Sequence, residues 1–398
     1  MGFIKDLFIQ GIHYIEKSVC DECFDDYAIK EFIKENASIK ECDYCGKSSK
    51  ESEIATSLHE IVEFMLEGIR YEWDEPGNCV GWEGGWVGAE VIDKYDLILE
   101  QLELEIENQQ LFDDIVRSIN IPEWCQRDPY NLPPGEEMFY NWEKFTEQVK
   151  HQIRYVFFRT RAEPRDLYDR RQPYAILNEI GNVINDLDLI KTLPADTEFM
   201  RVRIDNKRIK CKVNKLGPPP KHKAIYSNRM SPAGISMFYA STDEKTAIAE
   251  TYNKKDKLKK YATIATFKTI KPFNILELTH LPDFPSLFDR DKRHLRAPLI
   301  FLRSFLRDFS KPIIKDGREH IEYVPTQIVT EYFRHIFRDE GGNIIKGIIY
   351  PSSRRRNGKS CVLFFENKNC TQDNIASNID DDKWLMMISS SVKMSKLK

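Results

Sequence analysis

The sequence predicts an α+β protein, in which a mostly helical N-terminal domain with a four-cysteine zinc knuckle precedes an α+β domain. Three observations lead to this fold class. Two Cys-x-x-Cys pairs stand near the N-terminus, apolar residues recur at helical spacings through the first half, and short β-branched and aromatic runs mark the second half. The 398 residues are 41% hydrophobic, which is enough for two or three domains with cores of their own.

The charge and hydropathy of the chain argue against several classes of protein. A formal net charge of −4 provides no basic field for bulk nucleic-acid binding. No stretch approaches the roughly 18–20 consecutive apolar residues of a membrane span, and the N-terminal segment lacks the apolar run of a signal peptide. We therefore expect a cytoplasmic protein without a membrane partner.

The cysteine pattern predicts a structural zinc site. Four of the nine cysteines form two pairs, Cys20 with Cys23 and Cys42 with Cys45. Four thiolates at this spacing suit tetrahedral Zn²⁺, and Gly46 suits the tight turn expected after the second pair. Two redox dithiols are the alternative, but no thioredoxin-like βαβ pattern lies nearby. Because such a site has no open coordination position, the zinc would hold a subdomain at 1–50 together or present a surface to a partner.

The region 51–170 is predicted to be a helical domain. Apolar residues at spacings of three and four predict helices over 58–69 and 141–158, and one or two acidic helices within 90–119. The segments expected to be irregular are a Gly/Trp-rich loop at 73–88, a connection at 123–137 and a charged linker at 159–173.

Residues 171–370 are predicted to form the α+β domain. Helices are expected over 174–190 and 327–337, the second with Pro325 in its first turn. A polar tail that frays is expected over 371–398. Runs rich in β-branched and aromatic residues predict strands at 197–204, 235–240, 261–270, 273–278, 347–351 and 361–366.

One stretch combines a loop, a short strand, a turn and a helix: NRMSPAGISMFYASTDEKTAIAE, residues 228–250. Ser241 and Glu244 fit a capping box, which predicts a helix starting at about Thr242. Glu250 then lies two turns into that helix. The residues alone favour an ordinary interpretation, with a solvated glutamate, a core tyrosine at 239 and a surface arginine at 229, and their spacing does not overturn it.

This stretch resembles the central signature of the RES domain family, in which an Arg/Gly-rich loop, a YxA strand end and a TAxxE helix follow one another. The arginine, glutamate and serine for which the family is named correspond here to Arg201 in EFMRVRI, Glu250 in TAIAE and Ser352 in GIIYPSS, with Ser353 as the alternative. The resemblance covers roughly 195–370. The preceding region resembles the helical, cysteine-containing HEPN/RES N-terminal domain.

The resemblance implies an ADP-ribosyltransferase-like fold and an enzyme that consumes NAD⁺. Relatives hydrolyse NAD⁺ or phosphorolyse it with inorganic phosphate, and many are toxins that an antitoxin restrains. An antitoxin or regulatory partner and a homo-oligomer are therefore partners to consider. A trigger acting through residues 1–170 is a further hypothesis.

The resemblance also assigns roles to residues. Arg201 and Arg229 would bind the diphosphate, because a guanidinium matches phosphate oxygens bidentately. Glu250 would stabilise the positive charge that develops on the ribose. Tyr239 would pack its ring against nicotinamide, and the serine, Ser352 or Ser353, would donate hydrogen bonds to ribose or phosphate. Without the resemblance, Arg201 and Arg203 fit the wet face of an edge strand. The arginines at 354–356 fit either a surface turn or a phosphate contact.

Two other functions stay open. The same residues could transfer ADP-ribose to a macromolecule, or the chain could be a zinc-stapled binding module with an inactive RES-like half. HEPN ribonucleases typically carry an arginine followed four to six residues later by histidine. We find no convincing instance in the helical region, which disfavours a ribonuclease.

Overall fold

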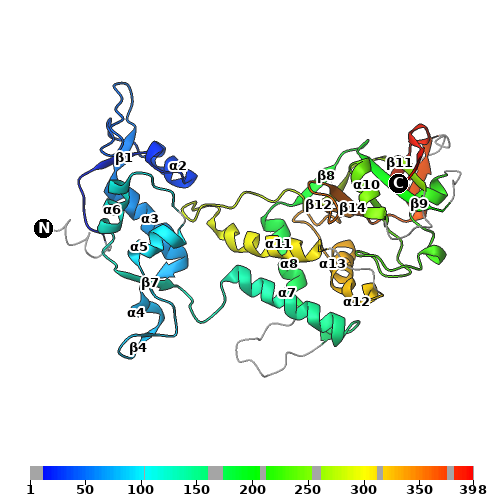
Figure 1. Ribbon diagram of the computed structural model, residues 1–398, viewed down its shortest axis with the longest axis horizontal. Coiled ribbons are helices and arrows are strands. Elements are labelled where there is room, and N and C mark those ends of the chain that lie inside the picture. The colour runs from blue at the N-terminus through cyan, green and yellow to red at the C-terminus, as the bar shows by residue number, and fades with distance from the viewer. Residues whose placement is uncertain are drawn as a thin grey trace. The chain divides into compact units, whose positions relative to one another are not determined.

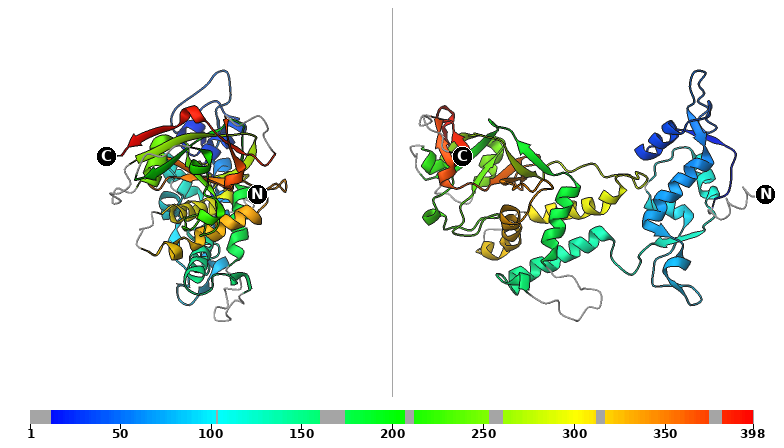
Figure 2. Two further views of the ribbon diagram at one scale, coloured as in Figure 1. Left: turned by 90° about the vertical axis from the view of Figure 1, so that its right-hand side faces the viewer. Right: turned by 180° about the vertical axis from the view of Figure 1, so that it is seen from behind.

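The computed structural model describes residues 12–102, 104–159, 174–206, 212–252, 261–311, 317–373 and 381–397 (Figures 1 and 2). It divides into two compact units. The first comprises Met1–Glu137 with Asp283–Pro298, and the second comprises Met138–Pro282 with Leu299–Lys398. Helices and strands occur in both, which confirms the α+β class. The predicted boundary at 170, and all but the first residue of the predicted linker, lie outside the described residues.

The first unit is mostly helical and has only short strands. β1 (Ser18–Cys20) pairs with β2 (Ala55–Ser57), and β4 (Gly81–Trp82) pairs with β5 (Trp86–Val87). A small sheet has the order β3-β7-β6 (Trp73–Asp74, Glu123–Gln126, Ile92–Asp93). The helices are α2 (Tyr27–Glu35), α3 (Leu58–Glu72), α4 (Pro76–Cys79), α5 (Lys94–Asp96) and α6 (Gln109–Ser118), and a π-helical turn covers Leu97–Gln101.

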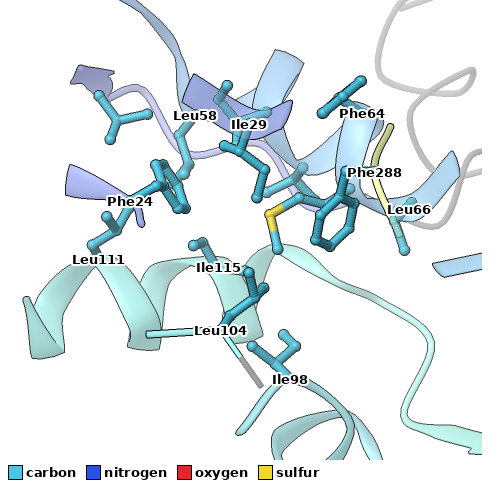
Figure 3. Close-up of a cluster of buried hydrophobic side chains, with 14 of the residues drawn as sticks. Phe24, Ile29, Leu58, Phe64, Leu66, Ile98, Leu104, Leu111, Ile115 and Phe288 are labelled. Atoms are coloured by element: carbon cyan, nitrogen blue, oxygen red, sulfur yellow. The ribbon is translucent and has the colours of Figure 1, made fainter. Parts of the chain in front are cut away.

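The α3 helix confirms the helix that the sequence predicts over 58–69. It begins after a capping box, in which the Ser57 hydroxyl and the Glu60 carboxylate satisfy each other's backbone N–H groups. Its apolar stripe meets side chains of α2 and α6 in one core, shown in Figure 3. Buried Cys20 and Cys42 belong to the same core. The cysteine segment therefore packs with the helices that follow it.

A segment from far along the chain completes that core. Phe288, in the stretch 283–298, lies beside Phe64 and Leu66 in Figure 3, and its ring centroid is 6.3 Å from that of Phe64. Gly68 makes room for it, since a Cβ there would lie 2.5 Å from Phe288 Cδ1. Arg290 pairs with Glu67 at 2.5 Å.

Several expected irregular segments contain regular structure. The stretch 73–88 forms β3, α4 and the β4–β5 hairpin, and 123–137 contains β7. The helix expected over 141–158 is α7 (Pro134–His151), which begins at a proline and ends seven residues earlier than predicted. None of the described helices is both long and apolar enough to cross a membrane.

The second unit is built on a ten-stranded sheet. Its order is β15-β16-β11-β9-β10-β14-β13-β12-β8, and β17 also pairs with β11. The helices are α8 (Ala175–Asp186), α9 (Val213–Leu216), α10 (Glu244–Thr251), α11 (Arg296–Phe309), α12 (Glu319–Glu322) and α13 (Val324–His335). The strands in chain order are β8 (Ile190–Leu193), β9 (Glu198–Asp205), β10 (Phe238–Ser241), β11 (Tyr261–Thr269), β12 (Phe273–Glu277), β13 (Gly347–Pro351), β14 (Lys359–Leu363), β15 (Cys370–Gln372), β16 (Leu385–Met387) and β17 (Lys393–Lys396).

The prediction of a frayed polar tail after 371 is wrong, because short strands of this region pair within the sheet. β16 and β17 pair with β11, and β15 pairs with β16. Leu385 and Met387 alternate with Met386 and are fully buried in the sheet's core. Because polar residues surround this short strand, the average composition of the region does not reveal it.

The sheet has two differently covered faces. One face carries a large apolar core that includes Phe199, Phe238 and Leu363. On the other face, Val202 of β9 packs with Ala247 of α10, and Met200 packs against the same cluster. The α10 helix contacts β9, β10 and β14 (Figure 1). Residues of β9 therefore alternate between the two faces, with α10 on one of them.

Candidate active site

The helix that carries Glu250 begins two residues later than predicted. Asp243 is the N-cap of α10 and accepts from the Thr246 N–H at 3.0 Å. The predicted capping box of Ser241 and Glu244 is absent, because Ser241 is still the last residue of β10 and pairs with Ser360. Thr246 and Ala247 are buried, and Glu250 is exposed at the end of the same helix.

Glu250 and Ser352 meet although 102 residues separate them. The Ser352 hydroxyl donates to Glu250 Oε1 at 2.5 Å, and the Ser360 hydroxyl lies 3.4 Å from the same oxygen. Ser352 Oγ also accepts the N–H groups of Arg354 and Arg355 at 3.2 Å. These bonds fix the hydroxyl as a donor toward the glutamate. The register places Ser352, not Ser353, against Glu250.

Two tyrosines lie on the same side of the sheet. Tyr350 of β13 is level with Ser360 of β14, and Tyr239 of β10 is level with Val362, two residues further along β14. Side chains two residues apart on a strand share a face. Tyr239 and Tyr350 therefore flank the strand that carries Ser360.

Both tyrosine hydroxyls are held in the neutral form. Burial raises the pKa of Tyr239, whose hydroxyl lies 2.9 Å from the Ser231 hydroxyl. Burial also raises the pKa of Tyr350 well above its usual value, and the charge of Glu250 adds to this effect while that of Arg229 opposes it. Tyr350 is the residue that sequence reasoning missed. Its signal was its position two residues before Ser352 in GIIYPSS.

Arg201 is brought to the opposite face. It stands between Met200 and Val202, which pack toward α10, and its guanidinium Cζ lies 5.0 Å from the centroid of the Phe238 ring on the other side. The guanidinium donates to the carbonyl oxygens of Leu216, Gly217 and Tyr239. Burial lowers the pKa of Arg201 to about 10.

The hydrogen bond from Arg201 to the Tyr239 carbonyl connects β9 with β10. β9 and β10 form one register pair, Met200 with Ser241, whereas β9 and β11 pair over eight residues. Beyond that pair, the arginine connects the two strands in place of ladder hydrogen bonds. It therefore fixes the strand end that carries Tyr239, while Arg203 is exposed and pairs with Asp205.

The Arg229 side chain is bound to the C-terminal end of α11. Its guanidinium donates to the carbonyls of Phe309 and Lys311, both at 2.7 Å, and so caps the last turn of α11. The Phe309 ring meets the Tyr350 ring edge-on, with centroids 6.3 Å apart. The guanidinium thus lies beside Tyr350, and its positive charge opposes the rise in the pKa of Tyr323 that burial causes.

The loop after Ser352 is anchored on α10. Arg355 donates to Asp243 at 2.5 Å and to the Thr246 hydroxyl at 3.0 Å. Burial opposes ionisation of Asp243, but the hydrogen bonds from Thr246 and the charge of Arg355 hold its pKa below the usual value. Gly358 touches the same threonine, and a Cβ there would lie 2.6 Å from Thr246 Oγ1. A guanidinium and a glycine therefore dock the loop beside Glu250.

The four cysteines form a candidate metal site. Their sulfur atoms all lie within 4.8 Å of one another, with Sγ–Sγ distances of 3.8 Å (Cys20–Cys23), 3.5 Å (Cys20–Cys45) and 3.6 Å (Cys23–Cys42). A Zn–S bond of about 2.3 Å in a tetrahedron requires sulfurs roughly 3.8 Å apart, so the donor set fits zinc. Gly46 follows with φ +71°, the left-handed turn expected after the second pair.

The second pair also has favourable electrostatics. Burial disfavours a thiolate at Cys42, but the N–H groups of Cys45, Tyr44 and Cys20 point toward its sulfur and lower its pKa. Tyr44, between the two cysteines, donates from its hydroxyl to buried Asp114 of α6 at 3.1 Å. The knuckle is thereby tied to the helical core.

Comparison with family models decides the family. A model described as RES domain matches residues 206–386, and a model described as HEPN/RES N-terminal domain 1 matches residues 35–163. The chain is a RES-domain protein. Comparisons with curated proteins and with solved structures found no significant match. A RES domain indicates an enzyme that acts on NAD⁺ in general terms.

The matched ranges bear on individual residues. Glu250, Ser352 and both tyrosines lie within the RES match, whereas Arg201 precedes it. Cys42 and Cys45 lie within the N-terminal match, and the first cysteine pair precedes it. The RES match also extends into β16, in agreement with the pairing of that strand in the sheet.

A separate cavity does not coincide with this cluster. It has a volume of about 360 Å³ and is lined by Pro219–Lys221, Ser236 and Glu366–Lys368. None of these residues contacts Glu250 or Ser352 in the described part of the chain. The hydrogen-bonded pair of Glu250 and Ser352 is therefore the better guide to the chemistry of this RES domain.

Proposed function

We propose that this protein cleaves the bond between nicotinamide and ribose in NAD⁺. The observation that carries the proposal is the hydrogen bond from Ser352 to an exposed glutamate, Glu250, on the sheet face that also holds Tyr239 and Tyr350. Loss of nicotinamide leaves positive charge on the ribose, as in glycoside transfer. A carboxylate beside that ribose stabilises the charge.

Each residue has a distinct part in this proposal. Glu250 faces the developing oxocarbenium, and Ser352 orients the carboxylate and can hydrogen-bond a ribose hydroxyl. Tyr239 and Tyr350 offer ring surfaces to the nicotinamide. Arg201 acts as a positioning residue, because its guanidinium is committed to backbone carbonyls and holds the Tyr239 strand end in place. A preorganised charged group such as Glu250 lowers the activation barrier by on the order of 3–4 kcal/mol.

The chemistry balances without a redox partner. The C1′–N bond breaks, its electron pair leaves with neutral nicotinamide, and an oxygen of water or phosphate bonds to C1′. With water as acceptor, one proton is released to solvent. The experiment below separates the two acceptors.

The test follows nicotinamide release by NMR, with and without inorganic phosphate. Glu250→Gln should reduce kcat by about 100-fold or more, as expected for loss of a charge that acts in the transition state. Glu244→Gln, on the same helix, is the matched control and should retain activity. Equal activity in wild type and Glu250→Gln would refute the assignment. An ADP-ribosylated macromolecule in place of free ADP-ribose would instead establish transfer.

We further propose that the cysteine quartet binds structural zinc. We also propose that the activity of the enzyme is restrained through the first unit, where an antitoxin or a trigger would act. The zinc proposal is supported by the sulfur spacing. Restraint is motivated by the appended unit alone. Deletion of 1–170 is a poor test of it, because this removes α7 of the second unit and strips the partners of Phe288. Substitutions on the surface of the first unit are the appropriate test, and unchanged toxicity of all of them in cells would argue against restraint.

A further inference from the structure

The loop Ser352–Lys359 is the most cationic short segment beside the proposed site. Its sequence, SSRRRNGK, contains four positive charges and no acidic residue, in a chain whose net charge is −4. The side chains of Arg354, Arg355 and Arg356 are exposed. A surface turn would serve its structural purpose without three adjacent arginines.

The loop is held in one conformation. The Ser352 N–H donates to the Gly358 carbonyl at 2.8 Å, and Gly358 N–H donates to the Arg355 carbonyl at 3.0 Å. Asn357 takes the left-handed conformation, with φ 59°. Together with the bond from Arg355 to Asp243, these contacts fix where the neighbouring side chains start. The arginines are thus displayed on a defined frame next to Glu250.

The three arginines differ in what neutralises them. Arg355 is paired with Asp243. In the part of the chain that the structure describes, the Arg354 side chain has no hydrogen bond or ion pair. The Arg354 N–H donates to Ser352 Oγ at 3.2 Å, and the Ser352 hydroxyl in turn donates to Glu250, so the Arg354 side chain starts next to that glutamate.

Arg229 lies near the same strand end, because it donates to the Phe309 carbonyl and the Phe309 ring meets the ring of Tyr350, two residues before Ser352. Arg229 has two of its N–H groups committed to carbonyls, which leaves donors available on the same group. A phosphate group is the anion whose oxygens match guanidinium donors bidentately.

We propose that loop Ser352–Lys359, together with Arg229, binds a phosphate group beside Glu250, with Arg354 as its principal ligand. The inference rests on the proposed function, because it names the anionic part of the substrate or co-substrate of that site. The phosphate is either the diphosphate of NAD⁺ or free inorganic phosphate that attacks C1′. Arg355 is a positioning residue, since its guanidinium is paired with Asp243 and anchors the loop.

The test compares two charge-matched variants of the full chain, Arg354→Gln and Arg356→Gln. Each removes one positive charge from the same exposed loop, so a general electrostatic effect is equal in both. The probes are inorganic phosphate and ADP-ribose, titrated calorimetrically. Arg354→Gln should weaken binding of at least one probe by about tenfold or more, as expected for lost charge-assisted hydrogen bonds, and Arg356→Gln should not.

Which of the two probes binds more weakly to Arg354→Gln identifies the source of the phosphate. Weakened phosphate binding alone supports an acceptor site, and weakened ADP-ribose binding alone supports a diphosphate site. Weakening of both supports a site that either ligand can occupy. The proposal is overturned if Arg354→Gln changes neither dissociation constant more than Arg356→Gln does.

A further variant separates this inference from the proposed function. Glu250→Gln should reduce nicotinamide release by about 100-fold or more while leaving the Arg354-dependent binding in place. If wild type releases no nicotinamide but shows that binding, the proposed reaction fails and the phosphate loop survives. If wild type releases nicotinamide and Arg354→Gln binds both probes normally, the loop assignment alone fails.

Discussion

Arg201 and Glu250 lie on opposite faces of one sheet. Glu250 is carried by α10, which packs on the face of Met200 and Val202, and Arg201 points to the side of Phe238. The arginine reaches the site through the backbone, by donating to the Tyr239 carbonyl. The guanidinium of this residue, which was expected to bind substrate, is therefore committed to the strand end that carries Tyr239.

This relationship predicts a large stability effect at Arg201. Arg201→Met removes the donors to three carbonyls, and unsatisfied buried polar groups cost about 1–3 kcal/mol each. We expect a loss of roughly 2–4 kcal/mol in the free energy of unfolding, because the strands can relax in part. Arg203→Met, on the same strand but exposed, should cost at most about 1 kcal/mol. Chemical denaturation measures both, and equal losses would contradict the structural role.

Tyr350 leads to a prediction about substrate binding. On the inactive Glu250→Gln background, Tyr350→Ala should weaken NAD⁺ binding by about tenfold, since an aromatic contact contributes roughly 0.5–1.5 kcal/mol beyond its buried area. Tyr350→Phe keeps the ring and should bind within about threefold of the parent. Calorimetric titration provides the dissociation constants. If the Phe variant loses as much affinity as the Ala variant, the hydroxyl rather than the ring makes the contact.

The parts of the fold that the sequence predicts are those with local causes. The α3 helix follows from its apolar period, and β13 follows from a bounded apolar run. The cysteine quartet follows from spacing within each pair. In each case, residues within a few positions of one another hold the decisive chemistry.

The parts that escaped prediction depend on long-range register. Tyr350 joins Tyr239 only because β13 and β10 both pair with β14. Asp243 replaces Ser241 as the N-cap because Ser241 is held in the β10–β14 ladder. β16 is three residues long, and its burial depends on β11, which lies more than a hundred residues away in sequence. No local period carries that information.

The cysteine quartet predicts metal-dependent stability. Purified protein should contain one Zn²⁺ per chain, and a chelator should lower the Tm of the first unit, because metal binding is coupled to folding of such sites. Cys45→Ser should lower both zinc content and Tm, whereas Cys79→Ser, a half-buried cysteine of the same unit outside the quartet, should leave the zinc content unchanged. Elemental analysis measures the zinc content, and thermal melts measure the Tm. A metal-free protein with an unaltered melt would rule out a structural zinc.

Gly68 and Phe288 make the last prediction, which concerns the segment 283–298 in the core of the first unit. In an exposed helix interior, Gly→Ala stabilises by about 1 kcal/mol. At Gly68 the sign should reverse, because the added Cβ would lie 2.5 Å from Phe288 Cδ1, and overpacking costs about 1–3 kcal/mol. Phe288→Leu should also destabilise on its own, through a cavity. The double variant should lose less than the sum of the two, because leucine leaves space for the new methyl group. Additive losses in denaturation experiments would mean that this segment does not pack against α3.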